Sequence, residues 1–356
     1  MSKVRVLVVE DSLTIRKRLV EVLEQTPNFE VVGEAEDGRQ AIDRCLALRP
    51  DAVTMDMMLP VMTGLAATEY IMAHCPTPIL VVSASFNRGE VFKTYDALAA
   101  GAVEVIEKPT GKEPPGVWER EFLSTLKIVS RVRVITHPRA RLNGVSPDRK
   151  VSGSVPALPI GPRKASLLAL GASTGGPNAL VEVLRSLPKD VEAPVLVVLH
   201  IGAAFAPAFG DWMGTQVPRP VSFARGGEVV RSLGKRIVFA PPDHHLVVRA
   251  GRLELTDDPE RHSCKPSVDV LFESVAREYG PEAAAGLLTG MGRDGALGLL
   301  ALRRSGAATI AQDEATSIIY GMPREAAELG AAERVLPLGE IGAALGALAR
   351  GKGPGP

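Results

Sequence analysis

A serine near the middle of the chain lies in a segment suited to nucleophilic chemistry. Residues 171–176 read GASTGG, directly after an apolar run at 165–170 and just before Pro177, which opens a helix with an apolar face. Ser173 is therefore predicted to lie in a strand-to-helix turn of the G-x-S-x-G form, with its hydroxyl at the carboxyl edge of a sheet. Backbone N–H groups at the helix start can bind an oxyanion, which favours acyl transfer. On spacing alone, a phosphate cradle is the alternative.

Two further residues complete the set that a nucleophilic serine needs. His200 ends the apolar run 194–199, and Asp294 lies in the segment GMGRDG at 290–295, between an apolar run and a helix. A histidine can take the serine proton, and a carboxylate can orient the imidazole. Taken singly, His200 would be a polar strand terminator and Asp294 a helix N-cap. Together they favour a catalytic triad in the order Ser, His, Asp, which differs from the order in α/β-hydrolases.

The first third of the chain carries a different set of polar residues, again at the ends of predicted strands. They are two acids after the first strand, one acid after the third, a hydroxyl at the end of the fourth and a lysine after the fifth: Glu10, Asp11, Asp56, Ser83 and Lys108. In a doubly wound sheet these ends meet at one edge. Three converging carboxylates bind a hard cation such as Mg²⁺. The set as a whole would let Asp56 accept a phosphoryl group.

The elements that would position these residues alternate between strand and helix. Apolar runs at 4–9, 30–33, 52–55, 78–82 and 103–106, with amphipathic stretches between them, predict a five-stranded parallel (βα)5 sheet. A second α/β pattern starts at residue 165. Within it, two β-like runs at 245–249 and 252–256 predict an antiparallel hairpin. The expected fold class is α/β with two doubly wound domains, the larger of which is mainly parallel.

Composition suggests the domain limits and excludes several classes of partner. We expect an N-terminal domain over 1–130, a linker rich in proline, glycine and basic residues over 131–163, a catalytic domain over 164–350 and a frayed tail over 351–356. The 41 Lys and Arg residues balance 41 Asp and Glu residues, so no overall field attracts nucleic acid. No run approaches the roughly 20 apolar residues of a membrane span. The expected location is the cytoplasm, without membrane insertion.

The N-terminal motifs closely resemble those of a two-component receiver domain over about residues 3–125. They read VVEDS at 8–12, MDMMLP at 55–60, VSA at 82–84 and EKP at 107–109. The resemblance implies that Asp56 is the phospho-acceptor and that Glu10 and Asp11 hold Mg²⁺ with it. It also implies that Ser83 and Lys108 contact the phosphoryl group, and that a chemotaxis-type histidine kinase is the phospho-donor.

The C-terminal motifs resemble the catalytic domain of the CheB family, the chemotaxis protein-glutamate methylesterases. They read GASTGG at 171–176, APPD at 240–243, PSVDVLF at 266–272 and TGMGRDG at 289–295. The resemblance implies that Ser173 is the nucleophile and that His200 is the general base and acid. It also implies that Asp294 orients the imidazole. Thr174 and Met291 would line the site near the oxyanion. Two contexts depart from the family pattern. His200 lies between leucine and isoleucine, and Cys264 stands where histidine is common.

The two resemblances together predict a phosphorylation-regulated serine hydrolase. It would demethylate glutamate methyl esters on methyl-accepting chemotaxis receptors, with release of methanol, and would also deamidate glutamines. The alternative is a receiver-linked signalling or binding module with a degenerate output domain. No cofactor is expected in the catalytic domain, because His244, His245, His262 and Cys264 lack a standard zinc spacing.

Overall fold

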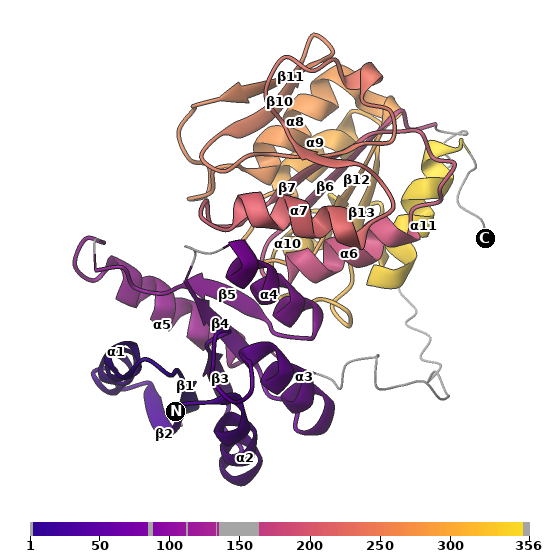
Figure 1. The fold of residues 1–356 in the computed structure, drawn as a ribbon. Helices are drawn as coiled ribbons and strands as arrows, with labels where there is room; N and C mark the ends of the chain where they lie inside the picture. The colour runs from indigo at the N-terminus through magenta and orange to yellow at the C-terminus, as the bar shows by residue number, and fades with distance from the viewer. Residues whose placement is uncertain (1–2, 85–87, 112, 133, 135–163, 352–356) are drawn as a thin grey trace. The chain divides into compact units, whose positions relative to one another are not determined.

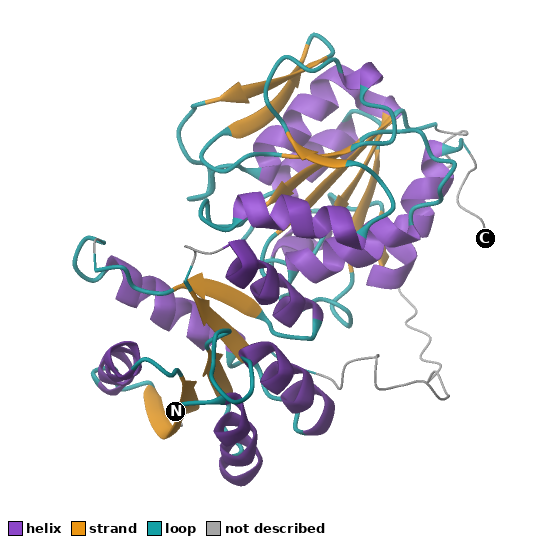
Figure 2. Ribbon diagram, viewed as in Figure 1, coloured by secondary structure: helices purple, strands orange, loops and turns teal. Residues whose placement is uncertain are grey.

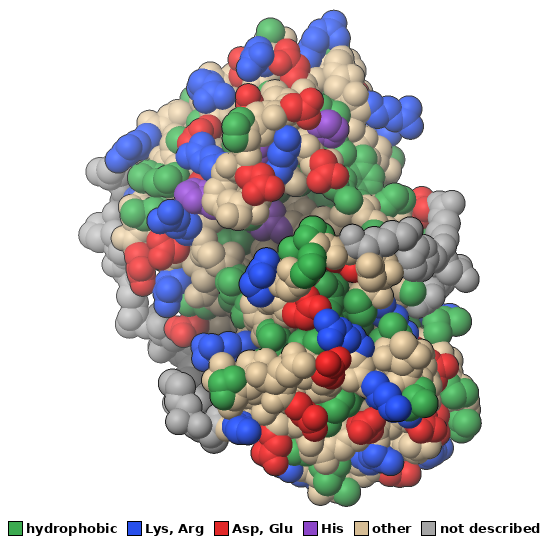
Figure 3. Space-filling view, turned by 90° about the vertical axis from the view of Figure 1, so that its left-hand side faces the viewer, with side chains coloured by type: hydrophobic (Ala, Val, Ile, Leu, Met, Phe, Trp, Pro, Cys, Tyr) green, Lys and Arg blue, Asp and Glu red, His purple; other side chains and the backbone are tan. Residues whose placement is uncertain are grey.

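The chain folds as two separate α/β units, spanning residues 1–150 and 151–356 (Figure 1). The computed structural model describes residues 3–84, 88–111, 113–132, 134 and 164–351. The predicted linker lies almost wholly outside these ranges, as does most of the predicted tail, so the domain limits stay predictions. None of the helices in the described ranges has the length and apolarity needed to cross a bilayer. Figure 3 shows basic and acidic side chains interspersed over one face, in keeping with the balanced composition.

The first unit contains five strands and five helices in strict alternation among its described residues. The strands are β1 (Val4–Val9), β2 (Phe29–Ala35), β3 (Ala52–Met55), β4 (Ile79–Ser83) and β5 (Glu104–Glu107). The helices are α1 (Leu13–Glu24), α2 (Gly38–Leu48), α3 (Gly64–His74), α4 (Arg88–Ala99) and α5 (Val117–Val129). The strands pair in parallel in the order β2-β1-β3-β4-β5, with α2, α3 and α4 on one face and α1 and α5 on the other (Figures 1 and 2). The predicted (βα)5 sheet is confirmed.

The second unit is built on a seven-stranded parallel sheet in the order β14-β13-β12-β6-β7-β9-β8. Its strands are β6 (Leu167–Ala172), β7 (Val195–Leu199), β8 (Val221–Phe223), β9 (Ile237–Phe239), β12 (Ala283–Leu287), β13 (Ala308–Gln312) and β14 (Arg334–Leu336). Helices α6 (Gly176–Ser186), α7 (Ala206–Gln216) and α11 (Leu338–Ala349) cover one face. Helices α8 (Val268–Tyr279), α9 (Ala296–Arg304) and α10 (Met322–Glu328) cover the other. Short 3₁₀ turns η2 (Val230–Ser232) and η3 (Gly280–Glu282) connect some of these elements.

The predicted hairpin forms at its expected bounds, as β10 (His245–Arg249) and β11 (Arg252–Thr256). Ala250 and Gly251 between them have φ values of 49° and 71°, the pair of positive angles that a tight hairpin turn requires. The hairpin is a two-stranded sheet of its own rather than part of the large sheet, and it packs on α8. The second unit is thus parallel in its main sheet and antiparallel only in this hairpin.

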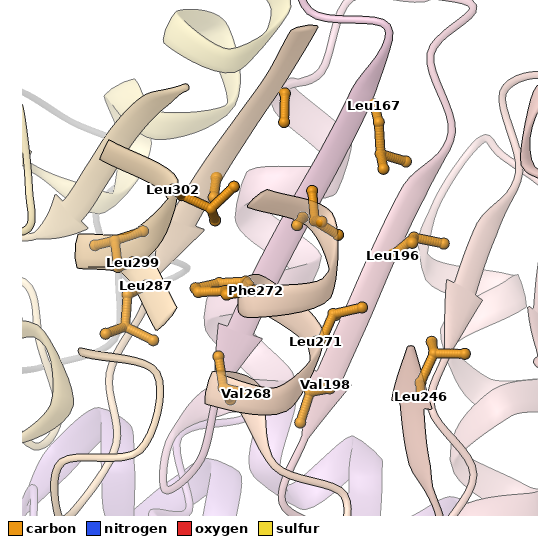
Figure 4. Packing of buried hydrophobic residues seen from close by; sticks show 14 of the residues in the cluster. Leu167, Leu196, Val198, Leu246, Val268, Leu271, Phe272, Leu287, Leu299 and Leu302 are labelled. Carbon is orange, nitrogen blue, oxygen red and sulfur yellow. The ribbon is translucent and has the colours of Figure 1, made fainter. Parts of the chain in front are cut away.

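Helix α8 lies at the centre of the second unit's core (Figure 4). Its buried residues Val268, Leu271 and Phe272 pack between the strands of the large sheet, helix α9 and the hairpin. Burial of such side chains contributes about 1.5–3 kcal/mol each to folding. Gly171 in β6 allows this approach, because a Cβ there would lie 2.3 Å from Val268 Cγ1. The amino end of α8 is therefore fixed close to the carboxyl ends of β6 and β12.

Candidate active site and carboxylate pocket

Ser173 follows β6 directly and is held from behind by the segment after β12. Its N–H donates to the Thr289 carbonyl oxygen at 3.0 Å. A Cβ on Gly290 would lie 2.8 Å from Ser173 Cβ, so only glycine permits this contact. Of the three glycines in the GASTGG turn, only Gly175 has a left-handed φ, of 74°. Since β6 runs on to Ala172, Gly171 lies inside the strand, and its role is close packing rather than turn geometry.

Two buried polar residues that the sequence analysis did not single out fix the serine turn. Thr289 Oγ1 donates to the Thr174 carbonyl oxygen at 3.0 Å and accepts from Ile319 N–H at 2.9 Å. Thr289 N–H donates to Gln312 Oε1 at 2.8 Å. The N–H groups of Thr174 and Gly175 donate no hydrogen bond within the described ranges. They are therefore available to an oxyanion beside Ser173, while Met291, predicted to line the site, is 52% exposed.

His200 follows the strand next to that of Ser173. Ala172 pairs with Leu199 across β6 and β7, so the next residues, Ser173 and His200, leave neighbouring strands at the same edge. His200 Nε2 lies 2.9 Å from Asp294 Oδ2, so Nδ1 is the nitrogen that can act on a serine. No hydrogen bond joins Ser173 Oγ to the imidazole in the described part of the chain, and such bonds often tighten only when substrate binds.

Asp294 is 2% exposed, and its carboxylate accepts four hydrogen bonds. Besides His200, the donors are Ser267 Oγ at 2.7 Å, Val268 N–H at 2.7 Å and Asp269 N–H at 3.1 Å. Burial raises the pKa of Asp294, but the hydrogen bonds and the charge of His200 outweigh burial and lower the pKa overall. As an isolated residue Asp294 was expected to cap the helix that follows it. Instead it lies at the amino end of α8, where the helix dipole also favours a negative charge.

Cys264 lies beside the other nitrogen of the His200 imidazole. Its Sγ is 3.8 Å from His200 Nδ1 and 3.5 Å from the His262 carbonyl oxygen. Burial lowers the pKa of His200, but the hydrogen bonds to Asp294 and Cys264 and their charges outweigh burial and raise the pKa to about 9. These two contacts favour the protonated imidazole over the neutral one.

The residues weighed as metal ligands serve other partners. His244 pairs with Asp257 at 2.7 Å, and His262 Nε2 lies 3.1 Å from Asp269 Oδ2. Asp294 belongs to both three-residue groups of potential ligands in this unit's described part, one with His200 and Cys264 and the other with His262 and Asp269. A carboxylate has about four lone-pair positions, and Asp294 already fills four. The donor set therefore does not fit a metal ion.

The first unit brings its polar residues together at the carboxyl edge of its sheet. Oxygens of Glu10, Asp11 and Asp56 lie within 4.8 Å of one another. Lys108 Nζ donates to Glu10 Oε1 at 3.0 Å and forms ion pairs at 3.0 Å with Glu10 Oε2 and Asp56 Oδ2. These last two oxygens are buried, and Lys108 Nζ is the one partner that the described residues give either of them. Three converging carboxylates that share a single ammonium group fit a hard cation such as Mg²⁺.

This carboxylate pocket, formed by Glu10, Asp11, Asp56 and Lys108, contains three acidic groups and one basic group. Burial and the charge of Asp56 raise the pKa of Glu10 to about 7, against the opposing effect of Lys108. Burial lowers the pKa of Lys108, but the charges of Asp56 and Glu10 outweigh it and raise the pKa. Ser83 is buried at the end of β4, where its hydroxyl accepts from Thr94 Oγ1 at 3.0 Å.

Arg16, a further residue that the sequence analysis missed, supports the pocket from α1. Its guanidinium is 6% exposed and donates to the Glu10 carbonyl oxygen at 2.7 Å. It also donates to Glu34 at 3.1 Å and to Glu36 at 2.8 Å. The arginine thereby ties the loop after β1 to the end of β2. Only its spacing after Asp11 could have signalled this role.

Comparisons with known proteins agree with this division of the chain. Residues 6–114 match the family model of the response regulator receiver domain, and residues 168–345 match that of the CheB methylesterase. A protein-glutamate methylesterase/protein-glutamine glutaminase of Nitrosospira multiformis is 43% identical, over 96% of this chain and 96% of its own length. The chain belongs to the CheB methylesterase family.

Two further proteins show the extent of the match to the CheB family. A protein-glutamate methylesterase/protein-glutamine glutaminase of Anaeromyxobacter dehalogenans is 42% identical, over 98% of this chain and 97% of its own length. A crystal structure of the CheB methylesterase catalytic domain of Thermotoga maritima also matches, with 31% sequence identity and a TM-score of 0.48. The match covers 51% of this chain and 97% of the Thermotoga maritima chain. The two family models match in the order that the sequence predicts, the receiver domain before the methylesterase domain.

Proposed function

We propose that Ser173, His200 and Asp294 form the catalytic triad of a protein-glutamate methylesterase that acts on methylated chemotaxis receptors. The observation that carries the proposal is the His200–Asp294 hydrogen bond at the strand edge from which Ser173 emerges. The names of the full-length relatives support the activity and add glutamine deamidation. A binding module with a degenerate site, the alternative, would not need an imidazole and a carboxylate held together beside a half-buried serine turn.

The geometry supports a two-step hydrolysis. Ser173 Oγ attacks the ester carbonyl carbon while its proton passes to His200 Nδ1, the nitrogen that does not face Asp294. The N–H groups of Thr174 and Gly175 stabilise the resulting oxyanion. The intermediate then expels the methoxy group, which takes the proton from His200 and leaves as methanol, so that an acyl-enzyme remains. Water, deprotonated by His200, releases the glutamate carboxylate and restores Ser173. With glutamine as substrate, the leaving group is ammonia.

The carboxylate pocket would regulate this activity through phosphorylation of Asp56. Glu10, Asp11 and Asp56 would hold Mg²⁺, which offsets the negative charge of the acceptor and of the incoming phosphoryl group. Lys108 already contacts Asp56 and would pair with a phosphoryl oxygen, and Ser83 would donate its hydroxyl to another. A histidine kinase of the chemotaxis type is the proposed donor.

The triad is tested by methanol release from a methylated receptor. The Ser173→Ala variant should fold like the wild type and lose at least about 10³-fold in kcat, as removal of a triad nucleophile does. Ser305→Ala is the matched control, since that hydroxyl only donates to a carbonyl of its own helix. Near wild-type turnover by the Ser173→Ala variant would leave the binding-module reading as the better account.

The phosphorylation site is tested with a small acyl-phosphate donor. The Asp56→Asn variant should lose Mg²⁺-dependent labelling and keep its basal esterase activity. Asp51→Asn is the control, because this exposed carboxylate only accepts from the N–H of Arg5. Label that persists in the Asp56→Asn variant and resists hydroxylamine would place the acceptor elsewhere.

A further inference from the structure

His245 is a buried histidine that takes no direct part in the proposed reaction. It is 0% exposed, and both ring nitrogens have partners. Nδ1 lies 3.1 Å from the N–H of Ser267, and Nε2 lies 3.1 Å from the carbonyl oxygen of Pro259. An N–H can only donate and a carbonyl oxygen can only accept. The ring must therefore be neutral, with its proton on Nε2 and a lone pair on Nδ1.

The residue that His245 holds is the one on which the orienting carboxylate depends. Ser267 is the N-cap of α8, and its hydroxyl donates to Asp294 Oδ1 at 2.7 Å. The next two N–H groups of the helix, of Val268 and Asp269, donate to the same carboxylate. The contacts form a continuous series from His245 through Ser267 to Asp294, and from there to His200 Nε2.

We infer that His245 is a positioning residue for the proposed triad. Its neutral Nδ1 fixes the first turn of α8, which fixes Asp294, which in turn orients the imidazole of His200. This inference rests on the proposed function. Its neighbour His244, just before the hairpin, offers a contrast, because its side chain is 43% exposed and its one ion-pair partner among the described residues is Asp257.

The contact matters because the alternatives for Ser267 N–H are poor. The residue is 0% exposed, so without Nδ1 its N–H would be buried and without an acceptor. The N-cap would move to reach water or another acceptor, and with it three of the four donors to Asp294. A shift of this kind at the orienting carboxylate turns His200 away from Ser173, and a misplacement of 1 Å can cost about 10²-fold in rate.

Two substitutions separate the two contacts of His245. In the His245→Asn variant, the amide oxygen takes the place of Nδ1 and can still accept from Ser267 N–H. In the His245→Gln variant, the amide nitrogen takes the place of Nε2 and can still donate to the carbonyl of Pro259. A role confined to packing or to the Pro259 loop would make the glutamine variant at least as active as the asparagine variant. The positioning role predicts the reverse order.

The assay is methanol release from methylated receptor with the full-length chain. We expect His245→Asn to keep kcat within a few-fold of the wild type, and His245→Gln to lose about ten- to hundredfold in kcat with little change in KM. In the same variants, the strongly deshielded ¹H resonance of the Nε2 proton between His200 and Asp294 should persist with asparagine and weaken or move with glutamine. His244→Gln is the matched control and should change neither readout.

Equal kcat values for the two variants, or a more active glutamine variant, would overturn the inference. A test on the unmodified chain covers the case in which neither variant folds. The ¹⁵N shifts of His245 should show a protonated Nε2 and an unprotonated Nδ1, and the opposite tautomer would also overturn the inference. Failure of the proposed function has a different signature, because the Ser173→Ala variant would then remain active whatever His245 does.

Discussion

Two aspartates that follow buried strands, Asp56 and Asp294, show opposite treatments of a buried carboxylate. Asp294 is 2% exposed and accepts four hydrogen bonds, three of them from the first turn of α8 and its cap. Asp56 is 1% exposed, and the described residues give its Oδ2 one partner, the Lys108 ammonium group at 3.0 Å, which also pairs with Glu10. Asp56 also shares its pocket with the carboxylates of Glu10 and Asp11.

The difference fits the two roles proposed for these carboxylates. A buried carboxylate with all its lone pairs filled keeps one charge and one position, as a residue that orients an imidazole must. Asp56 instead shares one ammonium group with Glu10, and like charges buried close together destabilise the folded protein. Asp56 is therefore in a state that binding of a cation or transfer of a phosphoryl group can relieve. The first arrangement suits catalysis, and the second suits a switch.

The largest effect is expected where the satisfied carboxylate loses its charge. In the Asp294→Asn variant the amide would face N–H donors and would no longer favour the His200 tautomer with its proton on Nε2. We expect kcat for methanol release to fall by about 10⁴-fold, as it does when the carboxylate of a serine triad is replaced by an amide. Asp258→Asn, at an exposed carboxylate that accepts from Thr256, should leave kcat unchanged. A small loss at Asp294 would mean that it serves α8 alone.

The second prediction concerns pH. His200 must be neutral to accept the proton of Ser173, and contacts with Asp294 and Cys264 raise its pKa to about 9. The value of kcat/KM should therefore rise about tenfold per pH unit below that pKa and level off above it. The Cys264→Ala variant removes one of the contacts that raise the pKa, so its profile should move to lower pH. A wild-type profile already level at pH 7 would contradict this account of the imidazole.

The parts of both sites that follow from strand order could be predicted from the sequence. Apolar runs locate the buried strands, and parallel sheets bring the residues after them to one edge. This reasoning placed Asp56 with Glu10, and His200 beside Ser173, without any knowledge of side-chain contacts. The hairpin was predicted at its observed bounds, because Ala250-Gly251 between two β-like runs is a strong local signal.

The contacts that complete the sites could not be predicted, because they depend on packing between distant elements. The donors to Asp294 lie 25 to 27 residues earlier in the chain, and α8 reaches it only because Gly171 leaves room for Val268. Nothing in the local pattern says which nitrogen of His200 faces the carboxylate. For the same reason His245 suggested only a metal ligand or an ordinary residue, although its partners make it part of the support of α8.

A smaller loss of kcat should follow when one hydrogen-bond donor to Asp294 is removed while the charge of Asp294 is kept. Ser267→Ala deletes a hydroxyl that donates to Asp294 Oδ1 at 2.7 Å and caps α8 by accepting from Val270 N–H. We expect kcat to fall about tenfold and the free energy of unfolding to fall by about 1 kcal/mol, the usual cost of a lost N-cap. Ser274→Ala is a sharp control, since this buried hydroxyl of the same helix accepts from Val248 N–H and does not contact Asp294. The control should lose stability without losing kcat, and equal kcat values in the two variants would show that the hydroxyl at 267 serves only the helix.

The smallest effect is expected at Asp56, the carboxylate that shares Lys108 with Glu10, and here the substitution should stabilise the protein rather than impair it. Asp56→Asn removes a charge that raises the pKa of Glu10, and it leaves Lys108 to pair with Glu10 alone. In Mg²⁺-free buffer the unfolding free energy of the first unit should rise by about 1 kcal/mol, because relief of like-charge repulsion exceeds the loss of one ion pair. Calorimetry can follow the unfolding of this unit separately. The unfolding transition whose temperature changes when Mg²⁺ is added to the wild type is the one assigned to the unit that contains the carboxylate pocket. Saturating Mg²⁺ should narrow or reverse this difference in unfolding free energy, because the wild type gains the binding energy of the cation and the variant has one charged ligand fewer.

A variant that is less stable than the wild type without Mg²⁺ would contradict this account. Asp56 would then be as well stabilised by its partners as Asp294, and the contrast between a fixed and a switchable carboxylate would not hold.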